Sequence, residues 1–266
     1  MRFEIAPGPD VGGNQQVGRA GGRVWFRRSA VVWAGLVGCI FLAKALFTYF
    51  IPMSPAAGHQ FQESALTWPA LVGMAVLGLA GLWFADRTGF PTGWDQRVSN
   101  RNRLVLPVVI GFASGLLMVA LDRAFNIGAT VAAVNNSPTL NIAFPGSLFA
   151  YASGGLWSEV LFRYLPLPLL LFLISNVALG GRNQVRVFWV LAILLAGLEP
   201  AVQTLPAMMR PGAPIAPLAM VAGLEFVVSL VQNILFRRYG FMASYGLRMG
   251  HYSVWHIIYG NFICQC

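Results

Sequence analysis

The sequence predicts an all-α polytopic membrane protein, and two observations carry this prediction. First, 57% of the residues are hydrophobic and only 10% are charged, whereas soluble domains carry roughly 25% charged residues. Second, the apolar residues are grouped into runs, and a helix needs roughly 20 apolar residues to cross a bilayer. About seven runs meet this length, at 30–52, 67–85, 104–121, 145–179, 187–204, 214–236 and 241–263.

The chain divides into a tail and a membrane domain. Residues 1–28 are rich in Gly, Arg and Gln, which predicts a flexible basic tail. Residues 29–266 then form the transmembrane domain. Within it, the run 145–179 is too long for one straight span, and we expect Pro166 and Pro168 to break or tilt its helix. If that run crossed twice, the number of spans would be eight.

Arginine is distributed unevenly among the loops. The formal net charge is +9, and the arginines gather before the first run and after the second, fourth and sixth runs. Cytoplasmic loops of membrane proteins carry an excess of Arg and Lys. With seven spans and a cytoplasmic N-terminus, every Arg-rich loop lies on the cytoplasmic side. The basic charge is therefore interpreted as a topology signal: the expected partner is the lipid bilayer, and nucleic acid is not expected.

Two charged residues stand four positions apart inside the fourth run. They are Glu159 and Arg163, in Gly154-Gly155-Leu156-Trp157-Ser158-Glu159-Val160-Leu161-Phe162-Arg163. Side chains at i and i+4 share one face of a helix and can pair. Charged groups inside a bilayer are costly and are usually functional. The pair therefore marks a candidate intramembrane site, in which its own role is either functional or that of a buried ion pair that locks the helix.

Later runs bring further ionisable groups to the same depth. Glu199 and Glu225 lie in the fifth and sixth runs. Arg248, Tyr252 and His256 follow one another at i,i+4 spacing in the seventh run, which places them on one helical face. Groups of this kind must face one another or water, so we expect the helices to bring them together.

These residues resemble the CPBP (Abi) family of CAAX-protease and bacteriocin-processing membrane enzymes, over residues 145–263. The family pattern is Glu-Glu-x-x-x-Arg, then Phe-x-x-x-His, then His-x-x-x-Asn or Asp with a later His. Glu159 and Arg163 match the second Glu and the Arg of that pattern, and Leu161-Phe162-Arg163 and Arg237-Arg238-Tyr239-Gly240 are also similar to the family. The differences lie at functional positions: Ser158 replaces the first Glu, Glu199 replaces a His, Arg248 and Tyr252 replace the His and the Asn or Asp, and His256 matches the later His.

The resemblance implies an intramembrane endopeptidase that processes a membrane-anchored or signal-bearing substrate in the bacterial inner membrane. In the family the first Glu is the favoured base for activating water, a task that Ser158 cannot perform without a base beside it. The base would then be Glu159 or Glu199, with His256 as a proton shuttle and Arg163 or Arg248 as an oxyanion donor. The need for a cofactor stays open. Glu199 and His256 are the candidate ligands if a divalent metal binds.

Two other functions remain open from the sequence. The replaced motif residues favour an inactive relative of the family, acting as a binding or assembly subunit of a membrane complex or as an immunity-type protein. A proton-coupled transporter could instead relay protons through Glu159, Glu199 and Glu225. The absence of an evident inverted repeat in the sequence counts against the transporter.

Overall fold

The computed structural model describes residues 18–54, 57–58, 61–62, 65–91, 93–134 and 140–264, with side chains described from residue 26 onward. Within these ranges the secondary structure is helical and contains no strand. The α-helices are α1 (Gly18–Tyr49), α3 (Trp68–Arg87), α4 (Leu106–Phe125), α5 (Ile127–Val134), α6 (Gly146–Glu159), α7 (Pro166–Leu171), α8 (Gln184–Gln203), α9 (Leu205–Met208), α10 (Ile215–Tyr239) and α11 (Phe241–Tyr252). Four π-helical segments continue or precede them: η1 (Arg101–Val105), η2 (Val160–Tyr164), η3 (Phe172–Ala178) and η4 (Ser253–Ile263).

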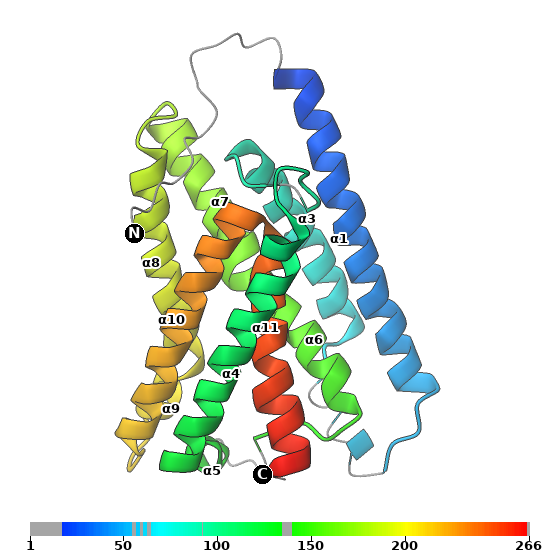
Figure 1. The fold of residues 1–266 in the computed structure, drawn as a ribbon, viewed down its shortest axis with the longest axis vertical. Coiled ribbons are helices and arrows are strands. Elements are labelled where there is room, and N and C mark those ends of the chain that lie inside the picture. Colours follow the sequence, from blue (N-terminus) through cyan, green and yellow to red (C-terminus); the bar gives the residue numbers. More distant parts are fainter. Residues whose placement is uncertain are drawn as a thin grey trace.

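The long helices run alternately up and down in a bundle (Figure 1). Among the described residues, six helical runs are long and apolar enough to cross a membrane: Phe26–Tyr49, Trp68–Arg87, Arg101–Phe125, Gly146–Ala178, Gln184–Gln203 and Ile215–Tyr239. These confirm the predicted class, an all-α polytopic membrane protein. The seventh expected run folds as α11 and η4, which pack against α4, α6 and α10. This run is less apolar than the other six, and its polar side chains face the interior of the bundle.

The first helix begins earlier than the sequence suggested. The tail was expected over 1–28, but α1 already starts at Gly18. Extending a helix costs far less than nucleating one, so the apolar run from residue 30 can propagate helix into the residues before it. The predicted boundary is corrected accordingly, and the expectation for residues 1–17 lies outside the described part of the chain.

The long fourth run is one continuous helical path through α6, η2, α7 and η3. Its two prolines do not break it, because Pro166 and Pro168 follow directly on the π-helical turn η2. In that turn the Leu165 amide donates to the Val160 carbonyl, five residues back, at 3.2 Å. The wider turn avoids the carbonyl clash that proline causes in a regular α-helix. At 1.5 Å per residue the path is longer than the roughly 30 Å hydrocarbon core, and Figure 1 shows it rising obliquely from α6 to α7.

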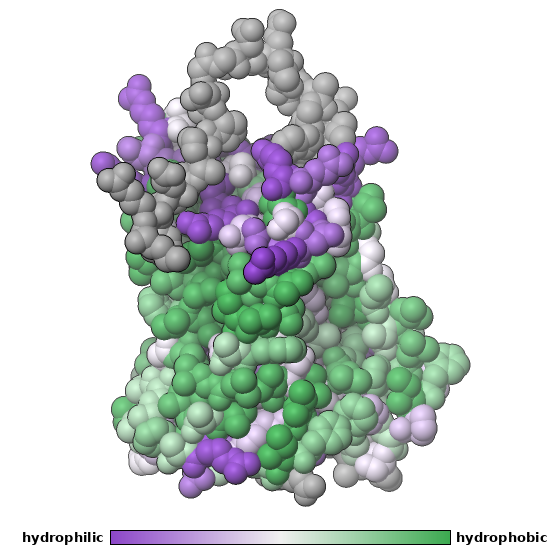
Figure 2. Space-filling model, viewed as in Figure 1, coloured by the Kyte–Doolittle hydropathy of each residue, from purple (hydrophilic) through white to green (hydrophobic). Residues whose placement is uncertain are grey.

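The Arg-rich loops gather at one end of the bundle. The first described turns of α1, the α3–α4 connection, the start of α8 and the α10–α11 turn lie together at the upper end in Figure 1, and Figure 2 shows a hydrophilic cap there above an apolar band. The cap is ordered by specific contacts. The Arg237 Nη1 donates to the Thr88 carbonyl at 2.7 Å, and the hydrogen bond from Arg97 holds the pKa of Asp95 below its usual range.

Large apolar side chains cover the outside of the apolar band. Leu42, Val76, Leu116 and Leu194 each expose more than 60% of their surface. A soluble protein would bury such residues, whereas hydrocarbon tails solvate them at no cost. The exposed apolar surface and the helix lengths together indicate an integral membrane protein.

Candidate functional site

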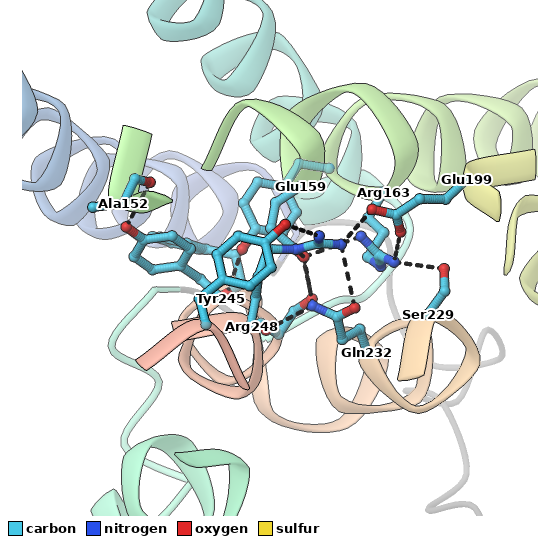
Figure 3. A network of polar contacts seen from close by, with 12 residues as sticks. Ala152, Glu159, Arg163, Glu199, Ser229, Gln232, Tyr245 and Arg248 are labelled. Atoms are coloured by element: carbon cyan, nitrogen blue, oxygen red, sulfur yellow. Dashed lines mark hydrogen bonds and ion pairs between the residues drawn. The ribbon is translucent and has the colours of Figure 1, made fainter. Parts of the chain in front are cut away.

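Four charged side chains form a closed ring of ion pairs inside the bundle (Figure 3). We call Glu159, Arg163, Glu199 and Arg248 the charge ring. Arg163 Nη1 lies 3.0 Å from Glu159 Oε1, which confirms the predicted i,i+4 pair, and Arg163 Nη2 pairs with Glu199 Oε2. Arg248 closes the ring, with Nη2 2.6 Å from Glu199 Oε1 and Nε 2.7 Å from Glu159 Oε1. Two carboxylates and two guanidiniums balance, so the ring as a whole is neutral.

The charge ring joins the three segments that carry the motif residues. Glu159 ends α6 and Arg163 lies in η2, while Glu199 comes from α8 and Arg248 from α11. All four side chains are buried, those of Glu159 and Arg163 completely. Burying a charge is tolerated when an opposite charge and hydrogen bonds compensate it. The helices therefore converge here, as the polar residues in the sequence predicted.

A glycine lets α11 approach α6 closely enough to build the ring. A Cβ atom at Gly155 would lie 2.6 Å from Met249 Cε and 3.2 Å from Arg248 Cδ. A larger residue at this position would force the side chains of Met249 and Arg248 to move. Gly155 thus leaves room for the Arg248 guanidinium to reach Glu159, which lies one helical turn further along α6.

Neutral polar side chains complete the hydrogen bonding of Glu159. Gln232 Nε2 donates to Glu159 Oε1 at 2.6 Å, and the Ser244 hydroxyl donates to Oε2. With the two arginines, four donors reach this carboxylate, three at Oε1 and one at Oε2. Sequence reasoning missed Gln232 and Ser244, and it also missed Ser229, whose Oγ accepts from Arg163 Nη2 at 2.5 Å. Gln232 and Ser229 had a signal: they are polar, three positions apart in an apolar helix, and share one face.

The carboxylate of Glu199 accepts fewer hydrogen bonds than that of Glu159. Its Oε1 accepts from Arg248 and, at 3.4 Å, from Gln203 Nε2, while Oε2 accepts from Arg163. Three donors leave roughly one acceptor position free. Glu199 also lines the neighbouring cavity, which Glu159 and Arg163 do not reach. Of the two ring carboxylates, only Glu199 is therefore in a position to meet a ligand.

The Arg248–Tyr252–His256 stripe lines the cavity, and the Tyr252 and His256 rings meet edge to face with centroids 5.0 Å apart, but the hydrogen bonds differ along it. Arg248 Nη1 donates to the Tyr252 hydroxyl at 2.9 Å. His256 Nδ1 instead lies 2.8 Å from Asn141 Oδ1, and the His256 ring stacks on Tyr151 with centroids 4.4 Å apart. Among the described residues, no hydrogen bond joins His256 to the charge ring. The π-helix η4 begins at Ser253, and His256 still lies beside Tyr252 on the cavity side of the run.

Ser158 stands outside the ring. It is half-buried, it does not line the cavity, and its neighbour Glu159 points about 100° away around α6. Ser158 therefore contributes nothing to the polar cluster.

A cavity of about 260 Å³ lies beside the charge ring. One wall is polar and includes Glu199, Arg248, Tyr252 and His256. Sequence reasoning placed His251 off the polar face, but His251 also lines the cavity, with its Nδ1 2.9 Å from Ser114 Oγ. The opposite wall is apolar and comes from α4, α5 and α10. The arrangement suits a ligand that has both a polar and an apolar part.

Side chains that could bind a metal ion are not clustered in the described part of the chain. Across the described residues, no three His, Cys, Asp or Glu side chains are grouped closely enough to hold a metal ion. Glu199, Glu225, His251 and His256 all line the cavity, but no three of them are grouped closely enough to hold a metal ion. The residues present therefore do not form a metal centre of the usual protein type.

Comparison with known proteins found no relative of this chain. The chain matches no protein-family model, no curated protein and no solved structure.

Proposed function

We propose that this chain is a CPBP-like membrane protein that acts by binding, as a subunit of a membrane complex or an immunity-type protein, and not by peptide hydrolysis. It would lie in the bacterial inner membrane with its Arg-rich end in the cytoplasm, since that end carries the positive charge of the loops. The observation that carries the proposal is the closed charge ring, in which Glu159 is completely buried, accepts four hydrogen bonds and does not line the cavity.

The chemistry of the ring supports a structural role for the motif residues. A general base must accept a proton from water, which requires a free lone pair within about 3 Å of that water. Glu159 is completely buried, already accepts hydrogen bonds on both carboxylate oxygens and does not line the cavity, so water in the cavity does not meet it. The replacements at Glu199 and Arg248 also compensate each other, because these two residues bring opposite charges to positions where the family has two histidines. In this proposal, the replacements turn the water-activating site of the family into an electrically neutral set of ion pairs that holds three helices together.

A second candidate is the endopeptidase that the resemblance implies. One observation favours it: Glu199, Tyr252 and His256 line the same cavity. Glu199 would activate water through its free acceptor position, His256 would carry the proton, and Arg248 would stabilise the oxyanion. Arg163 would not contact substrate in this mechanism, because it is sealed off from the cavity.

The test compares peptide N-termini in membranes of cells that produce the wild type, Glu199→Gln or Glu159→Gln. The binding function predicts the same set of N-termini in all three samples. A new N-terminus that appears with the wild type and disappears with both variants would contradict it and support the endopeptidase. Asp86→Asn, which changes a carboxylate of α3 outside the cavity wall, is the matched control. Immunoblots must show equal amounts of folded protein in each membrane.

A further inference from the structure

The cavity wall contains one carboxylate that the charge ring does not neutralise. Glu225, on α10, faces the cavity, and its Oε2 accepts a hydrogen bond from Thr204 Oγ1 at 2.9 Å. Within the part of the chain that the structure describes, no arginine or lysine forms an ion pair with Glu225. The other charged residues on this wall, Glu199 and Arg248, are paired with each other.

We propose that this cavity binds a small amphiphile with a cationic head, a protonated or quaternary amine, and that Glu225 is its counter-ion. The proposal deepens the binding function given above and rests on it. Because the charge ring is neutral, Glu225 sets the sign of the charge that the cavity presents. An anionic head would meet Glu225 and gain little from Arg248, whose Nε and both Nη atoms already donate to other groups.

Aromatic side chains favour the same head group. Tyr252, Trp255 and His256 line the cavity. The Tyr252 ring already has the Arg248 guanidinium 5.6 Å from its centroid, so Trp255 is the aromatic partner for a cationic head, and tryptophan faces attract cations most strongly. One face of Trp255 is stacked on Tyr259, with ring centroids 5.4 Å apart, which holds the indole in place. The two histidines of the wall are engaged elsewhere, His251 with Ser114 and His256 with Asn141.

The opposite wall fits an alkyl group. It is built from apolar side chains of α4, α5 and α10, among them Met118, Ile127, Val131, Leu218 and Val221. The volume of about 260 Å³ lies just below the roughly 300–1,000 Å³ of pockets for drug-sized ligands. A compact ammonium head with a short chain fits this volume, and a complete phospholipid does not.

The experiment measures binding to the full-length protein in phosphatidylcholine nanodiscs by isothermal titration calorimetry. Three probes share a six-carbon chain and differ in charge: hexyltrimethylammonium, hexyl sulfate and hexanol. We expect saturable binding of the cation, at least tenfold tighter than that of the anion or the alcohol. Glu225→Gln should weaken cation binding at least tenfold, whereas the control Asp86→Asn, outside the cavity wall, should leave it unchanged.

The proposal is overturned if hexanol or hexyl sulfate binds as tightly as the cation, or if Glu225→Gln binds the cation like the wild type. Trp255→Leu is a second variant that keeps Glu225 and should reduce the preference for the cation over hexanol. It decides the question if Glu225→Gln does not fold, as judged by its melting temperature. The cleavage assay above has a separate readout, so failure of cation binding and failure of the non-hydrolytic function can be told apart.

Discussion

Arg248 holds both carboxylates of the charge ring in place. It donates to Glu159 and Glu199 and also to the Tyr252 hydroxyl. Without it, Arg163 alone would face two buried carboxylates. Removing one partner of a buried ion pair typically costs more than the pair contributes, because an uncompensated charge is left behind.

Arg248→Met should therefore destabilise the protein by about 3–5 kcal/mol. The measurement is the free energy of unfolding in detergent, obtained by titration with a denaturing detergent. Adding Glu199→Gln to Arg248→Met restores the charge balance and should recover at least half of the loss, as a double-mutant cycle would show. Arg186→Met, at an exposed position of α8, should change stability by less than about 0.5 kcal/mol. An Arg248→Met protein as stable as this control would contradict the structural role of the ring.

The α4–α11 contact depends on glycines at the crossing. A Cβ at Gly111 would lie 2.1 Å from the Leu247 carbonyl oxygen, and one at Gly250 would lie 2.5 Å from the Val108 carbonyl oxygen. Both obstacles are backbone atoms, which cannot move aside as a flexible side chain can. Small residues of this kind allow membrane helices to approach closely. The crossing positions α11, and with it Arg248 and the aromatic part of the cavity wall.

Gly111→Ala should destabilise the protein by about 1–3 kcal/mol, the usual cost of overpacking, or more. Its melting temperature in detergent should fall accordingly. Gly223→Ala in α10 is the matched control, because a Cβ there meets nothing within 4 Å. Alanine favours helix over glycine, so the control should be neutral or slightly stabilising. Equal melting temperatures for the two variants would show that the close crossing does not form.

The bundle is electrostatically asymmetric from end to end. The Arg-rich connections lie at one end (Figures 1 and 2), and Arg123 in the last turn of α4 and Arg210 in the α9–α10 connection belong to the opposite end. The alternating direction of the helices produces this asymmetry, since every second connection returns to the same end. Such a distribution orients a membrane protein with its basic end in the cytoplasm.

Six helical runs among the described residues are long and apolar enough to span the membrane, and we predict that the less apolar run Phe241–Ile263 is a seventh crossing. We expect the N-terminus in the cytoplasm and the C-terminus on the other side of the membrane. Fusions of green fluorescent protein and of alkaline phosphatase to each end measure this directly. Fluorescence from the N-terminal fusion and phosphatase activity from the C-terminal fusion are expected. Both termini on one side would mean that Phe241–Ile263 does not cross.

The fold class and the Glu159–Arg163 pair could be predicted because both depend on local sequence. A run of apolar residues has few stable conformations in a bilayer other than a helix, and i,i+4 spacing places two side chains on one face whatever surrounds them. The boundary of α1 and the continuity of the run through Pro166 could not be predicted in this way. Each depends on helix propagation or on π-helical turns, which have no clear sequence signal.

The sequence alone therefore established a helical membrane protein with charged residues at membrane depth, because hydropathy and spacing are properties of the chain. Only the packed helices decided how those charges are used. Gly155 and the glycines of the α4–α11 crossing bring Arg248 within reach of two carboxylates from other helices. That approach turns separate charges into a neutral ring and leaves Glu225 as the unpaired carboxylate of the cavity wall. Such a result depends on distances between residues far apart in the chain, which no local pattern encodes.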